Sequence, residues 1–347
     1  MLNIANALAH KGYTVDLVLV AATGPYLTEV ENGITVVNLA SNHSSTSIPA
    51  LISYLRRRRP RVLISSLPHI SIATLIARRL SMVNCRAIIV EHNTISQTVA
   101  HSSSIKTKLL PLLMRLSYKY SDAIVGVSKG VALDLETQIK LPSDSVTVIY
   151  NPVITGRLEA LALETQEHPW FQADSPPVVV GIGRLTPAKN FSLLIDAFNK
   201  VRQKHEAKLV ILGDGQERSK LEALISALGL HNDISLPGFV PNPYNFLKHC
   251  ALFVLSSRWE GLPTVLIEAL ACGAPVLSTD CPSGPREILR DGKLGSLVSV
   301  NDSESLAAAI IGQISGKSPL PTVSPTDLCV YRLDYALQRY EELINHL

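Results

Sequence analysis

Residues 256–289 read SSRWEGLPTVLIEALACGAPVLSTDCPSGPREIL. The apolar run 264–271 predicts a buried helix that opens from a polar loop, and the short apolar run 275–279 predicts a buried strand. Two carboxylates, Glu260 in the loop and Glu268 in the helix, stand eight positions apart. Glu268 is either a solvent-facing helix residue or a buried Glu that requires a partner. Its apolar neighbours favour the second interpretation and make it a candidate functional residue.

Short apolar runs and helical patterns alternate along the rest of the chain in the same way. Strands are expected at 15–20, 62–65, 87–90, 123–127, 178–181, 208–212, 234–236, 251–255, 275–279 and 295–298. Helices are expected at 2–10, 51–58, 72–80, 107–120, 192–205, 217–228, 243–249, 264–271, 284–290, 303–314 and 331–347. This alternation predicts an α/β fold with doubly wound parallel sheets.

The chain of 347 residues is long enough for two domains of ordinary size. The break is expected near Asn151-Pro152, followed by a polar stretch that runs through Ser175-Pro176-Pro177. We therefore expect one domain over 1–151, a second over 152–326, and a C-terminal helix within 327–347 that can pack back across the junction. Two Rossmann-like halves facing a cleft would bind ligands at the carboxyl ends of their strands.

The first domain is expected to be incomplete. The chain opens with the helix at 2–10, whereas a doubly wound domain normally begins with a strand and a Gly-rich turn. That first strand is central, so its absence would leave two neighbouring strands with unpaired backbone groups. The true start is then expected upstream, or the chain is a truncated copy.

Composition excludes some functions. A hydrophobic content of 46% with 18% charged residues indicates a globular protein, and a net charge of +3 gives no case for nucleic acid binding. The basic run RRRRPR at 56–61 is either a solvated helix end or a contact for anionic lipid or phosphate.

The cysteines indicate a reducing compartment. They form no CxxC pair and no metal-ligand spacing, so we expect them to fill the core: Cys85, Cys250, Cys272, Cys281 and Cys329. No apolar stretch is long enough to span a bilayer, and the opening residues lack a signal-peptide pattern. A cytoplasmic protein without a metal is the expectation.

The turn at 181–190 reads GIGRLTPAKN and follows an expected strand. Its two cations, Arg184 and Lys189, can hold a diphosphate and neutralise charge on a departing one. The alternative is a pair of exposed surface cations. The glycines, including Gly183, do not spell the dinucleotide fingerprint, which argues against a nicotinamide cofactor.

The segment EGLPT at 260–264 supplies further candidates. Pro263 suits the first turn of a helix, and Gly261 lets backbone approach a ligand closely. The exposed amides of that helix start favour phosphate, and the two oxygens of Glu268 suit a ribose diol.

Two more turns follow strands. Gly213-Asp214-Gly215 is one, and the segment LPGFV at 236–240 is the other. The second can cradle a nucleotide base against its backbone and Phe239, although both turns are equally consistent with ordinary connections.

Taken together, the second half resembles the donor-binding domain of glycosyltransferase family 4, retaining enzymes of the GT-B fold. The resemblance rests on the GRL-x3-KN turn, the GDG turn, the L-x-GF segment and the E-x7-E element, over about residues 148–314 and more weakly in the N-terminal half. The form CPSGPREI at 281–288 resembles bacterial members that build surface polysaccharides or lipid-linked glycans.

The resemblance implies a role for each matching residue. Arg184 and Lys189 would bind the donor diphosphate, and Glu268 would hold the ribose hydroxyls. Glu260, with the amides of Gly261 and Leu262, would contact the donor sugar and its phosphate. The remaining residues implied at the donor site are Gly183, Gly213, Asp214, Phe239, Val240, Pro263 and Thr264.

In the N-terminal half, which the resemblance implies is the acceptor side, His92 matches the family's active-site histidine. A histidine after a strand is, by itself, more often a hydrogen-bonded structural residue. Glu91, His69 and His101 are weaker candidates.

The resemblance implies transfer of a hexose from a nucleotide-diphosphate sugar to a sugar or lipid-linked glycan acceptor, with retention and without metal or cofactor. Two alternatives stay open: a catalytically silent nucleotide-sugar-binding remnant, and a nicotinamide-dependent oxidoreductase.

The segment 105–120, IKTKLLPLLMRLSYKY, is basic and apolar together. It can lie on an anionic membrane, which would make the protein peripheral on the inner face of the plasma membrane. Packing onto the sheet is the alternative.

Overall fold

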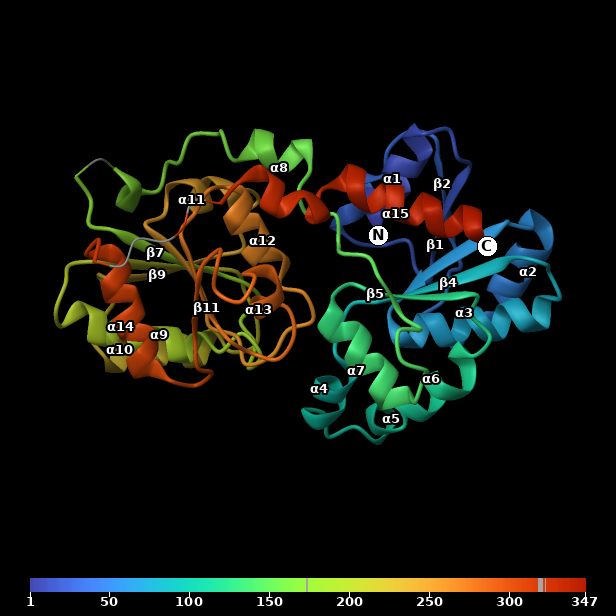
Figure 1. Ribbon diagram of the computed structural model, residues 1–347, viewed down its shortest axis with the longest axis horizontal. Helices are drawn as coiled ribbons and strands as arrows, with labels where there is room; N and C mark the ends of the chain where they lie inside the picture. The colour runs from blue at the N-terminus through green and yellow to red at the C-terminus, as the bar shows by residue number, and fades with distance from the viewer. Residues whose placement is uncertain (173, 318–320, 322) are drawn as a thin grey trace. The chain divides into compact units, whose positions relative to one another are not determined.

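The computed structural model describes residues 1–172, 174–317, 321 and 323–347 of an α/β chain. It divides into two compact units (Figure 1). Met1–Pro152 and Val330–Leu347 form the first, and Val153–Cys329 form the second. Both units consist of parallel strands connected by helices, as the alternating pattern predicts.

The first unit contains two sheets. Its strands are β1 (Val15–Leu19), β2 (Ile34–Asn38), β3 (Val62–Ser66), β4 (Arg86–Glu91), β5 (Ala123–Gly126) and β6 (Thr147–Val148). β1 pairs with β2, while β3, β4, β5 and β6 form a separate sheet in that order. Among the described residues neither β1 nor β3 has a second pairing strand.

The helices of the first unit enclose these sheets. They are α1 (Leu2–His10), α2 (Ile48–Arg58), α3 (Pro68–Ser81), α4 (Ile95–Ala100), α5 (Ile105–Lys108), α6 (Leu110–Tyr118), α7 (Lys129–Ile139) and α15 (Leu333–His346). One core cluster joins β4 to α3, α6 and α7 and contains Ile89, Leu75, Met114 and Leu135. Figure 1 shows α15 beside α1. Lys11, at the C-terminal end of α1, forms an ion pair with Glu341 of α15 at 2.6 Å.

The second unit is one six-stranded parallel sheet with helices on both faces. Its strands are β7 (Val178–Ile182), β8 (Lys208–Leu212), β9 (Ile234–Gly238), β10 (Leu252–Leu255), β11 (Val276–Thr279) and β12 (Ser296–Val298). The spatial order is β12-β11-β10-β7-β8-β9. The chain therefore runs outward from β7 in one direction and returns to build on β10 in the other, so the order reverses between these two central strands.

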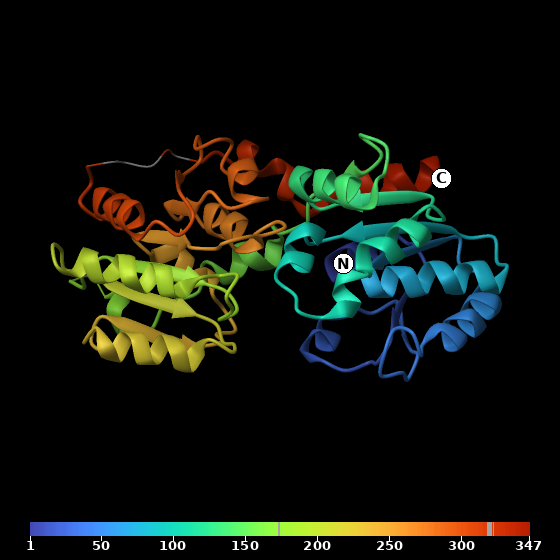
Figure 2. The same ribbon diagram turned by 90° about the horizontal axis from the view of Figure 1, so that it is seen from below.

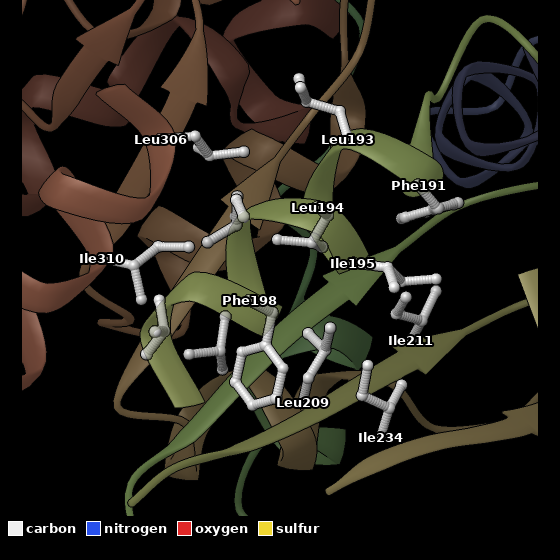
Figure 3. Close-up of a cluster of buried hydrophobic side chains, with 14 of the residues drawn as sticks. Phe191, Leu193, Leu194, Ile195, Phe198, Leu209, Ile211, Ile234, Leu306 and Ile310 are labelled. Atoms are coloured by element: carbon white, nitrogen blue, oxygen red, sulfur yellow. The ribbon is translucent and has the colours of Figure 1, made fainter. Parts of the chain in front are cut away.

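The second unit's helices form two layers. They are α8 (Gly156–Leu161), α9 (Phe191–Arg202), α10 (Arg218–Ala227), α11 (Tyr244–His249), α12 (Thr264–Ala271), α13 (Pro285–Ile288) and α14 (Ser303–Ile314). α9 packs with α10 and α14 on one face, and α11 packs with α8 and α12 on the other (Figures 1 and 2). Figure 3 shows the core under α9, where Phe198 and Leu194 meet Leu209 of β8 and Ile310 of α14.

Three short 3-10 helices complete the secondary structure of the described residues: η1 (Pro25–Glu29), η2 (Pro169–Phe171) and η3 (Pro325–Tyr331).

All ten predicted strands are present, but some elements were missed or placed wrongly. β2, β6, α4, α7 and α8 were not predicted; β6 has two residues and α4 and α8 only six each, too few to show a period. The single helix predicted at 107–120 is wrong: α5 and α6 are separate and begin at Ile105, with Pro111 in the first turn of α6.

Two further expectations need correction. Pro263 is the N-cap of α12 and lies just outside the helix, which begins at Thr264. Four of the cysteines are buried as expected, but Cys329 is exposed and so does not fill the core.

The basic run 56–61 forms a helix end, one of its two predicted interpretations. α2 ends at Arg58, and the next residue has left-handed backbone. Arg58 pairs with Asp16 at 2.7 Å, and Arg56 donates to the carbonyl of Leu80 at 3.1 Å. These contacts hold the end of α2 against β1 and α3.

Candidate active site

The predicted donor residues lie in loops at the carboxyl ends of four strands of the second unit. Gly183 to Lys189 follow β7, Gly213 and Asp214 follow β8, Phe239 and Val240 follow β9, and the segment 260–264 follows β10. β7 and β10 are the adjacent central strands between which the strand order reverses. Open α/β sheets bind ligands at such a switch point because the two loops diverge there and leave a crevice.

The loops after β7 and β10 are joined by an ion pair. Lys189 Nζ lies 2.6 Å from Glu260 Oε1, and Ser257 Oγ donates to the same oxygen at 2.6 Å. The Ser256 hydroxyl also donates to the carbonyl of Lys189 at 2.8 Å. The sequence analysis assigned Lys189 and Glu260 to separate parts of the donor and missed their pairing. It also missed the two serines, whose position directly after β10 was the only available signal.

Glu268 lies one turn inside α12 and is half-buried among apolar neighbours. Burial raises the pKa of Glu268 to about 7, and the charge of Lys189 acts in the opposite direction. Lys189 is therefore electrostatically coupled to both carboxylates of the E-x7-E element. A carboxyl group with a pKa near neutrality changes its hydrogen-bonding capacity with small changes in surroundings.

The side chain of Arg184 is exposed and makes no hydrogen bond or ion pair with any residue that the structure describes. It sits in the same loop as Lys189, directly after Gly183. The site thus holds one cation that is already paired and one that is available to an anion. This is an arrangement that suits a diphosphate, whose charge exceeds what a single lysine neutralises.

Close backbone contacts fix the loops after β7 and β8 to each other. The amide of Leu185 donates to the carbonyl of Asp214 at 2.9 Å, and the amide of Gly183 donates to the carbonyl of Leu212 at 3.0 Å. Gly213 has φ +130°, and a Cβ there would lie 2.1 Å from the Gly183 carbonyl oxygen. Only glycine fits at this crossing, so the GDG turn has a structural reason as well as a proposed binding role.

Phe239 is the most exposed apolar side chain of the site, with 81% of its surface accessible, whereas Val240 is half-buried. An aromatic ring left in water at the carboxyl end of the edge strand β9 can stack on a planar base. The ring is therefore available for the role that the sequence predicts.

The loop after β11 supports the segment 260–264. The Ser283 hydroxyl donates to the Gly261 carbonyl at 2.7 Å, and the Glu260 amide donates to the Pro282 carbonyl at 3.3 Å. Leu262 of this segment is buried. These contacts fix the backbone that leads into the start of α12.

His92 lies in the first unit, directly after β4, and is half-buried. Burial lowers the pKa of His92 to about 4, so the imidazole is neutral at neutral pH. His69 and His101 are both exposed, and His101 Nδ1 lies 3.0 Å from the Gln97 carbonyl oxygen of its own helix. Of the three predicted histidines, His92 alone combines burial with a position at a strand's carboxyl end.

Glu91 is buried on the α6 side of β4, where Tyr118 donates to its Oε1. Its Oε2 has no hydrogen-bond partner among the described residues. Burial raises the pKa of Glu91 to about 7, partly offset by the Tyr118 hydrogen bond. Glu91 therefore belongs to the core of the first unit, and its raised pKa follows from that burial.

Glu91 is expected to make the stability of the first unit depend on pH. Because its pKa is raised in the folded state, its stabilising effect is complete below the unfolded pKa of 4.5 and is lost as pH rises through about 7. The Glu91→Gln variant should lose this dependence, which amounts to about 3 kcal/mol in the unfolding free energy. Denaturant unfolding at about pH 5 and about pH 8 measures it.

The exposed carboxylate Glu342, in the same unit, provides the matched Glu342→Gln control, which should follow the parent protein at both pH values. If the unfolding free energy of Glu91→Gln changed with pH as much as that of the parent protein, Glu91 would not be the source of the pH dependence.

No group of three or more His, Cys, Asp or Glu side chains suited to a metal ion occurs among the described residues. None of the helices in the described part of the chain has the length and apolar character needed to cross a membrane.

Two known protein families match this chain. Residues 1–157 match the family described as Glycosyltransferase Family 4, and residues 164–320 match the one described as Glycosyl transferases group 1. The boundary between the two matches falls within a few residues of the boundary between the two structural units.

Curated relatives include transferases of bacterial glycans. The chain is 33% identical over 223 residues to N-acetylgalactosamine-N,N'-diacetylbacillosaminyl-diphospho-undecaprenol 4-alpha-N-acetylgalactosaminyltransferase of Campylobacter jejuni, covering 64% of this chain and 59% of that protein. It is 26% identical over 310 residues to the amylovoran biosynthesis glycosyltransferase AmsD of Erwinia amylovora, covering 88% and 83%. The chain spans about half the length of several other curated relatives, between 47% and 55%.

Solved structures share the fold. HepE of Anabaena, crystallised in complex with UDP, superposes with a TM-score of 0.78 at 19% identity, covering 100% of this chain and 95% of that one. Both family matches and this likeness agree with the resemblance that the sequence motifs carry. The chain belongs to the family 4 glycosyltransferases of the GT-B fold.

Proposed function

We propose that the protein transfers a hexose from a nucleotide-diphosphate sugar to a sugar or lipid-linked glycan acceptor, with retention of configuration. The observation that carries this proposal is the set of charged groups at the switch point of the second unit: the Lys189–Glu260 pair, Glu268 inside α12, and the unpaired Arg184. Such a set matches a ligand with a diphosphate beside two hydroxyl-bearing sugars.

The names of the relatives support a proposal for the class of donor and the class of acceptor. The Campylobacter relative is named for a diphospho-undecaprenol acceptor, the Erwinia relative for amylovoran biosynthesis, and the Anabaena structure contains UDP. By analogy with these proteins, we propose that the present chain uses a UDP-sugar as donor. We propose that its acceptor belongs to surface polysaccharide or glycoconjugate synthesis. The proposed location is the inner face of the plasma membrane.

Each donor group would meet a side chain of matching chemistry. Lys189 has three donor hydrogens, so it can keep its contact with Glu260 and bind phosphate as well. Arg184 would hold the outer diphosphate oxygens, and Glu268 the ribose diol. Glu260, Gly261 and Leu262 would face the transferred sugar.

The remaining predicted residues would complete the pocket. Phe239 and Val240 would carry the base, and Gly183, Gly213 and Asp214 would let the backbone approach it. Pro263 and Thr264 would present the start of α12 to phosphate.

In the reaction, the acceptor hydroxyl oxygen would bond to the anomeric carbon on the face from which the diphosphate departs. The carbon–oxygen bond to the diphosphate breaks, and the departing phosphate oxygen takes the hydroxyl proton. Arg184 and Lys189 would stabilise the charge that develops on this leaving group, so no metal is required. His92, in the first unit, would act near the donor sugar as a neutral hydrogen-bonding group.

The nicotinamide alternative lacks support because the turn after β7 has the wrong glycine pattern. The silent-remnant alternative accounts less well for the unpaired Arg184 and the exposed Phe239, since neither side chain has a structural role among the described residues.

Nucleotide binding is tested by thermal unfolding with UDP, GDP or NAD. A ligand at about one hundred times its Kd adds about 3 kcal/mol to the unfolding free energy, which raises Tm by roughly 6–12 °C for a unit of this size. UDP is expected to give this rise and NAD none. Phe239→Ala should reduce the UDP shift, since stacking of a base on an aromatic ring contributes about 1–3 kcal/mol.

Leu163→Ala removes an equally exposed apolar side chain from the same unit and serves as the matched control. A Tm rise with NAD alone would overturn the proposal. Transfer is then measured with a panel of radiolabelled UDP-hexoses and an undecaprenyl-diphosphate-linked acceptor. Nucleotide binding without any transfer in this panel would favour the silent remnant.

A further inference from the structure

Leu67, the residue that connects β3 to α3, has an unusual backbone conformation. Its φ is +75° and its ψ is 128°. Glycine reaches this region readily, but a Cβ makes it unfavourable, and a bulky residue there is an outlier. By contrast, Arg59, Met82 and Lys140 also have positive φ, but their ψ lies between 22° and 58° and they end helices in the ordinary way.

The local structure explains only part of this conformation. Pro68 restricts the residue before it to ψ values near the observed one. The Leu67 carbonyl accepts from the amides of Ile70 at 3.0 Å and Ser71 at 2.9 Å, which fixes the start of α3. All of these constraints act on backbone atoms, and a glycine at position 67 would satisfy them without steric cost. The leucine side chain is therefore the feature that needs an explanation.

The side chain of Leu67 is partly left in water at the carboxyl end of β3. It is 40% exposed, and it belongs neither to the core cluster around β4 nor to the one around α2. Ser66 pairs with Val90 in the parallel register, so Leu67 lies beside Glu91, one residue before His92. Because neighbouring strands are about 4.8 Å apart, this exposed apolar side chain and the candidate histidine share one edge of the sheet.

We infer that Leu67 is a specificity-determining residue whose side chain contacts the apolar C–H face of the acceptor sugar. The inference rests on the proposed function. The proposed donor contacts, His92 apart, all lie in the second unit, so the acceptor is the substrate left for this edge of the first unit. An aliphatic side chain cannot bond to hydroxyl groups, but it can cover the C–H groups of a sugar ring. Unfavourable backbone of this kind is typical of ligand-binding sites, where the surrounding structure holds it in place.

The test is the steady-state transfer kinetics of the full chain and of two variants, Leu67→Ala and Leu67→Gly. Both variants lose the side chain beyond Cβ, so each should lower kcat/KM for the acceptor about tenfold, chiefly by raising the acceptor KM. The KM for the UDP-hexose and the Tm rise with UDP should equal those of the parent. The acceptors are one glycan on undecaprenyl diphosphate and the same glycan on farnesyl diphosphate. Equal losses with both are expected, since the contact is to the sugar.

Comparison of the two variants separates the side chain from the backbone. Alanine keeps the Cβ and with it the unfavourable conformation, whereas glycine relieves it. The Tm of Leu67→Gly is therefore expected to exceed that of Leu67→Ala by roughly 2–4 °C, the reverse of their order at an ordinary position. Transfer should nevertheless be equally weak in both variants.

Met82→Ala and Met82→Gly are the matched controls. Met82 also has positive φ, at +57°, and is 85% exposed, but it lies at the other end of α3. Glycine should again give the higher Tm of the pair, while both variants transfer as the parent does. This result would show that relief of unfavourable backbone in the first unit does not by itself alter transfer.

An unchanged acceptor KM in both Leu67 variants would overturn the inference. So would a parent-like KM in Leu67→Gly alone, since the backbone would then be what matters. A rise in the KM for the UDP-hexose alone would place the side chain at the donor, and a loss confined to the undecaprenyl acceptor would place it at the lipid; either result contradicts a sugar contact. Failure of the proposed function is recognised separately, because the parent protein itself would then transfer no hexose.

Discussion

Replacement of Arg184 by Gln is expected to lower kcat/KM for hexose transfer by about two to three orders of magnitude, the usual effect of removing one group that stabilises developing charge. Arg184 is exposed and unpaired among the described residues, so its loss should leave folding intact. Exposed substitutions of this kind change stability by no more than about 0.5 kcal/mol, or roughly 1–2 °C in Tm.

Comparing the change in kcat with the change in KM shows whether Arg184 acts in substrate binding or in the transition state. A fall in kcat with little change in KM would place its contact in the transition state, as expected for a group that neutralises the departing diphosphate. Lys204→Gln removes an exposed cation of the same unit, distant from the switch-point loops in sequence, and is the matched control. Activity of Arg184→Gln equal to that of this control would contradict the assigned role.

Lys189 is a poorer residue for this experiment. Its side chain is tied to Glu260 at 2.6 Å in a partly buried pair, and removal of one partner leaves the other charge uncompensated. A loss of activity in a Lys189 variant would therefore mix an effect on the donor with an effect on the fold.

Replacement of Gly213 by Ala is expected to destabilise the second unit by at least about 3 kcal/mol, which lowers Tm by roughly 6–12 °C. The added Cβ would lie 2.1 Å from the Gly183 carbonyl oxygen, so the loops after β7 and β8 must separate. Backbone atoms cannot move aside as a flexible side chain can, and the whole crossing has to shift. Thermal unfolding followed by circular dichroism measures the change.

Gly229→Ala separates this clash from backbone strain. Gly229 also has positive φ, at +68°, but a Cβ there would meet nothing within 4 Å. Its substitution should cost only about 1 kcal/mol, the energy of a left-handed conformation for a residue with a Cβ. Equal losses in the two variants would mean that the contact between the two loops does not determine stability.

The sequence was a good guide wherever the signal is local. Strand β8 and helices α1, α12 and α14 have the predicted bounds because apolar runs and helical periods arise from neighbouring residues. The same holds for the loops that carry the candidate site, since a turn after a buried parallel strand must lie at its carboxyl end. Most errors fell on short elements and on the α5–α6 segment, where a proline interrupts one continuous pattern. The 11-residue helix α7 was also missed.

The sequence by itself determined the fold class, the two-part organisation and the residues expected at the donor site. Only the tertiary structure decided which of those residues meet. Lys189 and Glu260 are 71 residues apart, and they pair because the strand order reverses and makes β7 and β10 neighbours. Likewise, the sequence could not divide the apolar residues of 105–120 between a buried and an exposed face. That division depends on which side of α6 contacts the sheet, and contact with the sheet is a property of the folded unit.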